Sequence, residues 1–145
     1  MKVEIINLSG CRIISQTFIK KWVQIIFKEL QKKKIKIYKP HLNLVFVKSA
    51  EMKKLNRTFR SKNKPTDVLS FAPSENFSSK QAELGEIVLC TSYIKNMGQG
   101  PVRERTAYAI LHGILHLLGF EHEKNPQSAK KMYNIQDQIF EKYFE

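Results

Sequence analysis

The chain has 145 residues, of which 42% are hydrophobic, and this predicts one globular domain over residues 1–145. It has no apolar run near the roughly 18 residues of a membrane helix, no signal-peptide pattern and no CxxC pair, so we expect a cytoplasmic protein with no membrane partner. Lysine and arginine number 25 against 13 acidic residues, and the net charge of +12 favours RNA or DNA as a partner, with a solvated lysine-rich surface as the alternative.

The first part of the chain carries two strand patterns and two helix patterns. Val3 and Ile5 alternate with polar residues, which predicts a strand. Ser15 is placed to cap a helix, and the apolar residues that follow it recur at helical spacing: Phe18, Trp22, Ile25, Ile26 and Leu30. The apolar residues 42–47 predict a buried strand. Ser49 would cap a second helix, whose inner face would carry Met52, Leu55 and Phe59.

The middle of the chain consists of short segments. A polar loop is predicted over residues 60–66, a strand over 67–71, a mobile Ser-rich loop over 73–80 and a strand over 85–90. Strands and helices alternate irregularly along the whole chain. This pattern predicts an α+β fold, in which a central mixed sheet of about four strands packs against helices.

Two helices are predicted in the last third. Pro101 suits the first turn of a strongly apolar helix, and Gly119 is placed to end that helix in a left-handed conformation. The core positions of this helix are Ala107, Ile110, Leu111, Ile114, Leu115 and Leu118. Pro126 opens the last helix. Its inward residues are expected to be Ala129, Met132, Ile135, Ile139 and Tyr143.

Three of the four histidines gather at the end of the apolar helix. His112 and His116 are four residues apart, so both rings project from one helix face, and the turn at Gly119 can bring His122 back toward them. Three imidazoles with no cysteine nearby predict an open catalytic site for one Zn²⁺ per chain. The fourth histidine, His41, is expected to be a surface or hydrogen-bonded residue.

A second segment, residues 56–71, combines a helix end, a basic loop and a strand. Its positive charge comes from Arg57, Arg60, Lys62 and Lys64. The planar fork of an arginine suits phosphate oxygens, but a solvated basic loop is common, so this segment alone is a weak signal.

Together the two segments resemble the YbeY family of metal-dependent endoribonucleases, which mature bacterial ribosomal RNA. The family motif His-Gly-x-Leu-His-Leu-x-Gly-Tyr-Asp-His is matched over residues 112–122, with Phe120 in place of Tyr and Glu121 in place of Asp. The family's Arg-x-Lys loop and its Pro-Thr-Asp-Val-Leu-Ser-Phe strand are matched over residues 60–71. Residues 84–87 resemble its Leu-Gly-Asp-Ile strand, again with Glu for Asp.

The resemblance implies an α+β fold with the metal helix beside the central sheet. It implies a zinc-type ion on His112, His116 and His122, and a role for Arg60 on the RNA phosphate. The expected function is therefore maturation of small-subunit (16S) ribosomal RNA and ribosome quality control, with the ribosomal small subunit and assembly factors as partners. Single-stranded RNA is the expected substrate, because its backbone can bend into a cleft and its bases can unstack.

Two alternatives stay open at the level of the sequence. In a zinc peptidase of the metzincin type, a glutamate base lies between the two helical histidines, and Gly113 occupies that position here. Glu121 is the nearest carboxylate within the motif; it can serve as a base or orient a ligand, and an exposed loop acid is an equal alternative. The other possibility is a non-catalytic RNA-binding assembly factor that the metal only braces, against which the missing fourth protein ligand argues.

Overall fold

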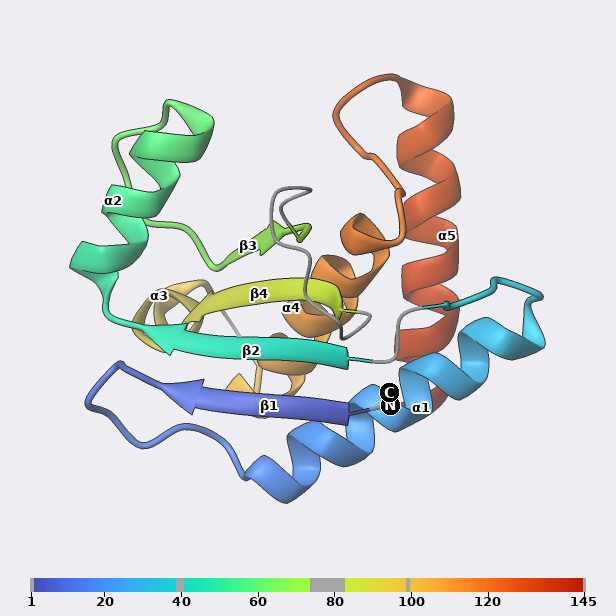
Figure 1. Ribbon diagram of the computed structural model, residues 1–145, viewed down its shortest axis with the longest axis horizontal. Helices are drawn as coiled ribbons and strands as arrows, with labels where there is room; N and C mark the ends of the chain where they lie inside the picture. The colour runs from blue at the N-terminus through green and yellow to red at the C-terminus, as the bar shows by residue number, and fades with distance from the viewer. Residues whose placement is uncertain (1, 39–40, 74–82, 99, 145) are drawn as a thin grey trace.

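A four-stranded mixed sheet organises the chain (Figure 1). The computed structural model describes residues 2–38, 41–73, 83–98 and 100–144, so nearly all of the predicted Ser-rich loop lies outside the described residues. The sheet has the order β1-β2-β4-β3, in which β1, β2 and β4 are parallel and β3 is antiparallel to β4. The strands are β1 (Lys2–Asn7), β2 (His41–Val47), β3 (Val68–Phe71) and β4 (Glu83–Cys90). The predicted α+β fold is confirmed.

Helices cover both faces of this sheet. Those in the described part of the chain are α1 (Gln16–Lys32), α2 (Ser49–Arg60), α3 (Thr91–Asn96), α4 (Val102–Leu117) and α5 (Pro126–Tyr143). Ser15 caps α1 as predicted, since its side chain accepts a hydrogen bond from the Phe18 amide. The short helix α3 was not predicted, because its six residues are too few to show a helical apolar period.

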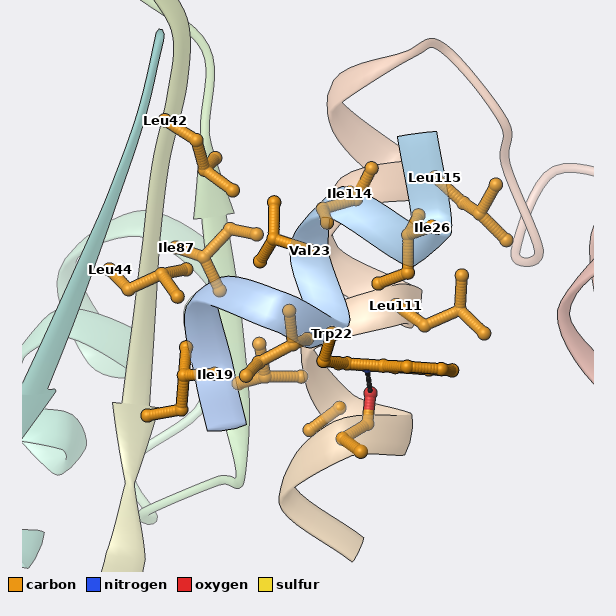
Figure 2. Packing of buried hydrophobic residues seen from close by; sticks show 14 of the residues in the cluster. Ile19, Trp22, Val23, Ile26, Leu42, Leu44, Ile87, Leu111, Ile114 and Leu115 are labelled. Atoms are coloured by element: carbon orange, nitrogen blue, oxygen red, sulfur yellow. Dashed lines mark hydrogen bonds between the residues drawn. The ribbon is translucent and has the colours of Figure 1, made fainter. Parts of the chain in front are cut away.

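The larger core lies between the sheet and helices α1 and α4 (Figure 2). Trp22 is almost fully buried there, and its indole Nε1 donates a hydrogen bond to the Ala107 carbonyl at 2.8 Å, which ties α1 to α4. Leu111 and Leu115 are fully buried in the same layer, as predicted. Since α4 carries two of the three clustered histidines, this packing fixes the base of the candidate site.

The opposite face of the sheet is covered by α2, and here three details of the prediction are wrong. Lys48, not Ser49, occupies the capping position, and it makes no side-chain capping bond. Phe59 is 62% exposed, because α2 buries Met52 and Asn56 while its last turn is exposed. That turn includes Arg60, so the loop begins one residue later than predicted. Its first residue is Ser61, which has a left-handed backbone conformation.

His41 also departs from expectation. It begins β2 and is only 8% exposed, because its backbone pairs with Lys2 of β1 on one side and Glu83 of β4 on the other. Its Nε2 lies 3.7 Å from a Glu4 carboxylate oxygen and has no hydrogen-bond partner in the described part of the structure. His41 is therefore not a surface histidine, and its Nε2 has the nearby Glu4 carboxylate in place of a hydrogen bond.

Glu29 of α1 connects this helix to the end of α5 through hydrogen bonds. Its side chain is only 8% exposed, and one carboxylate oxygen accepts hydrogen bonds from the Tyr143 hydroxyl at 2.8 Å and from Lys142 Nζ at 3.0 Å. Tyr143 was predicted to point inward, but it is 41% exposed, because its hydroxyl reaches Glu29 and its ring meets Trp22 edge-on.

Glu29→Gln is expected to lower the free energy of unfolding at neutral pH and to lose this effect in acid. Hydrogen bonds from Tyr143 and Lys142 lower the pKa of Glu29 from 4.5 to about 2. Folding therefore favours the ionised carboxylate, and this stabilisation is complete above about pH 4.5 and is lost as the pH falls toward 2. Urea unfolding at about pH 7 and about pH 3 measures the change, with Glu51→Gln as an exposed control. An equal loss at both pH values would contradict an ionic origin.

Candidate metal centre

The end of α4 turns the chain so that three histidines meet. The Gly119 amide donates to the His116 carbonyl and the Phe120 amide donates to the Leu115 carbonyl, each at 3.0 Å, and these two bonds form a Schellman motif. Gly119 has a φ of +97°, which confirms the predicted left-handed stop. His112 and His116 project from the last turns of α4, and the reversed chain carries His122 back to them.

The three rings form a compact group of nitrogen donors. One nitrogen from each of His112, His116 and His122 lies within 4.8 Å of the others, and the Nε2 atoms of His112 and His116 are 3.1 Å apart. A tetrahedral zinc ion with nitrogens at its usual bond length holds them about 3.3 Å from one another. His122 Nδ1 is buried without a hydrogen-bond partner among the described residues. The donor set therefore fits a zinc-type ion.

Burial keeps two of these rings, His112 and His116, neutral, as a metal ligand must be. Burial and, after it, the neighbouring His112 and His122 together lower the pKa of His116 to about 4. The pKa of His112 is also lowered, mainly by burial, while the hydrogen bond that it donates to Gln136 acts in the opposite direction. At neutral pH both rings consequently offer a lone pair to a cation.

Gln136 orients one of the candidate ligands, His112, and this role was not predicted from the sequence. It is fully buried on α5, and its Oε1 lies 3.0 Å from His112 Nδ1. Since an amide oxygen only accepts hydrogen bonds, this contact places the proton on Nδ1 and leaves Nε2 facing His116. A signal was present, because Gln136 is a polar residue between Met132 and Ile139 on the apolar face of the last helix.

The histidines lie in an open cleft of about 770 Å³, here called the metal cleft. From the predicted set, Arg60, Lys62 and Glu121 line it. Arg57 and Lys64 are exposed and lie outside its lining. The structure therefore brings together only part of the predicted basic segment.

Arg60 has a partner that the sequence did not indicate. Its guanidinium donates to a carboxylate oxygen of Glu123 at 2.6 Å, and this contact lowers the pKa of Glu123. The same oxygen is 3.6 Å from His122 Nε2. Glu123 directly follows the last histidine, but its pairing with a residue 63 positions away has no sequence pattern.

Gly113 explains why no glutamate base lies between the helical histidines. A Cβ atom at this position would be 2.9 Å from Cδ1 of Ile87 in β4 and 3.1 Å from the Ser70 hydroxyl, so a larger residue would require these side chains to shift. The Ser70 hydroxyl donates to the Gly113 carbonyl at 3.2 Å and holds the helix against β3. Gly113 is buried and does not line the metal cleft, so this position does not supply the base of a metzincin-type peptidase.

An α+β fold with an open three-histidine site and an arginine in the same cleft is typical of metal-dependent hydrolases. The family model described as Endoribonuclease YbeY matches residues 4–144. Proteins named Endoribonuclease YbeY from Bdellovibrio bacteriovorus and Buchnera aphidicola are 37% and 35% identical to the chain, over 97% and 96% of it and 94% and 90% of their own lengths. The solution structure of TM1509 from Thermotoga maritima superposes with a TM-score of 0.60 at 26% identity, covering 94% of this chain and 87% of that one.

The chain belongs to the YbeY endoribonuclease family. This confirms the predicted resemblance and the predicted class of enzyme.

Proposed function

We propose that this chain is a metal-dependent endoribonuclease for single-stranded RNA, which matures 16S ribosomal RNA and takes part in ribosome quality control in the cytoplasm. Its ion is proposed to be zinc, one per chain, on His112, His116 and His122. The observation that carries the proposal is that these three donors share one cleft with Arg60 and Lys62. We take residues 1–145 as one catalytic domain.

The residues of the cleft suit phosphodiester hydrolysis. A bound zinc ion would lower the pKa of a water molecule or polarise a phosphoryl oxygen. Arg60 would stabilise the charge that develops on the phosphate. Glu121 lines the same cleft, where its carboxylate would accept a proton from the attacking group or orient a ligand.

The basic residues around the cleft would hold the RNA strand. Lys62 lines the cleft, while Arg57 and Lys64 would meet phosphates beyond it, so binding should weaken with salt. The net charge of +12 and the family name both favour RNA as the partner, and we propose the ribosomal small subunit and its assembly factors as further partners. No helix in the described ranges is long and apolar enough to span a membrane.

Removal of the metal tests the proposal. Chelator-treated protein should keep its circular dichroism and thermal transition, lose cleavage of a single-stranded RNA, and regain cleavage when zinc is restored. The reason is that the core between the sheet, α1 and α4 does not include the three histidines. Stripped protein that still cleaves would exclude metal catalysis. Stripped protein that unfolds, with holoprotein that never cleaves, would favour the metal-braced assembly factor.

A further inference from the structure

A second, smaller pocket of about 290 Å³, here called the side pocket, opens next to the metal cleft. It shares Asp67, Tyr108 and Ala109 with the lining of the cleft, so the two spaces adjoin along these residues. Its other walls include Pro101, Glu104 and Phe140. The side pocket lies below the size range of sites for drug-sized ligands and suits one flat ring system.

Helix α4 sets the spacing between the side pocket and the metal ligands. Glu104, Tyr108 and His112 follow one another at intervals of four residues, so the three side chains lie along one face of the helix. With the rise of an α-helix, Tyr108 is about 6 Å and Glu104 about 12 Å along the axis from His112. A strand held at the metal site would place a neighbouring nucleotide at this distance.

The aromatic wall of the side pocket is rigid. The Tyr108 hydroxyl donates to an Asp137 carboxylate oxygen at 3.1 Å, and its ring meets Phe140 edge-on with 5.0 Å between centroids. These two contacts hold the ring on the boundary between the two spaces. A fixed aromatic ring next to a single-stranded backbone is a stacking platform for a base.

The polar wall of the side pocket repels phosphate and accepts N–H donors. Within the described residues the Glu104 carboxylate has no hydrogen bond or ion pair from a side chain. The nearby Arg105 guanidinium is already engaged by the carbonyls of Gly98 and Lys95. An ionised carboxylate accepts hydrogen bonds only, and two adjacent N–H groups on one base edge are found on guanine.

We infer that the side pocket binds one unstacked nucleobase of the RNA, adjacent to the scissile phosphate, and that guanine is the best-matched base. The base stacks on Tyr108 and presents its Watson–Crick edge to Glu104. The phosphates then follow the metal cleft, which Arg60 and Lys62 line and the side pocket's Glu104 does not. This inference rests on the proposed RNA cleavage.

The test uses single-turnover cleavage of one single-stranded RNA, either intact or with an abasic nucleotide at each position flanking the cleaved bond in turn. For the wild-type protein, an abasic nucleotide at one position next to the cleaved bond should lower the cleavage rate by about tenfold. Tyr108→Leu should cleave intact RNA about tenfold more slowly and show no further loss at that position. The metal content of each variant is measured, because Tyr108 is one helical turn from His112.

A base analogue tests the contact with Glu104. Inosine lacks the guanine amino group, so at the sensitive position it should slow the wild-type protein by about fivefold and Glu104→Gln by much less. Glu51→Gln, a matched change in the first turn of α2 outside both spaces, should behave as wild type. Equal inosine effects in the wild type and Glu104→Gln would overturn the assignment of Glu104.

The remaining outcomes separate this inference from the function on which it rests. Wild-type protein that leaves intact RNA uncut would overturn the proposed function together with the side pocket's role. The wild-type protein could instead cleave intact RNA, while an abasic nucleotide at every position slows wild type and Tyr108→Leu equally. That result would overturn the nucleobase site alone.

Discussion

His116→Ala is expected to abolish stoichiometric metal binding and, with it, RNA cleavage. His116 supplies one of the three donors of the group, since its Nε2 is 3.1 Å from His112 Nε2 and its ring centroid is 4.8 Å from that of His122. Mutation of a residue that only hydrogen-bonds a metal ligand already costs about 10–100-fold in metal affinity, so removal of the ligand itself should cost more. Elemental analysis after dialysis measures the metal, and thermal unfolding shows that the variant is folded.

His41→Gln is the matched control, because His41 is the histidine outside the group. It should retain one ion per chain. Full occupancy in His116→Ala would show that the ion is held elsewhere and that the three-histidine site is misassigned.

Arg60→Ala is expected to slow cleavage of a single-stranded RNA by about a hundredfold while the protein remains folded and metal-loaded. The rate falls because the substitution removes the guanidinium of Arg60, which lines the metal cleft and would stabilise charge on the phosphate. Stability should hardly change, because the Arg60–Glu123 pair is 37% and 54% exposed and such pairs contribute about 0–1 kcal/mol. Single-turnover rates at fixed salt, with metal content and thermal transition recorded for each variant, measure both effects.

Two further variants sharpen the interpretation. Arg60→Lys should recover only part of the rate, since an ammonium group cannot reproduce the planar fork. Arg57→Ala removes the same charge from the same helix outside the cleft, so it should weaken RNA binding without a comparable loss of rate at saturating protein. An unchanged rate in folded Arg60→Ala would move the charge-stabilising role to Lys62 or Lys64.

Some features of the site are local, and these could be predicted before the fold was seen. The four-residue spacing of His112 and His116 orients both rings whenever the segment is helical, and Gly119 reverses the chain through a motif complete within six residues. Burial of Leu111 and Leu115 likewise follows from the apolar period of one helix. Such features depend on contacts within a few residues, which the sequence displays directly.

Other predictions failed where a distant segment determined the outcome. Phe59 has the spacing of a core residue, but the last turn of α2 is exposed beside the cleft. His41 lacks any burial signal of its own and is enclosed by pairing with β1 and β4. Periodicity cannot report these results, because it describes one element and not what that element packs against.

By itself the sequence determined the family, the mixed α+β fold and the three clustered histidines, since periodicity, turn residues and short motifs all act within single segments. Only the tertiary structure decided that Gln136 supports His112, that Glu123 pairs with Arg60, and that Glu104 and Tyr108 line a pocket that adjoins the cleft. The physical reason is the strand order β1-β2-β4-β3, which brings α2, α4 and α5 around one cleft from far apart in the chain. Contacts between such segments depend on packing, and no local pattern encodes them.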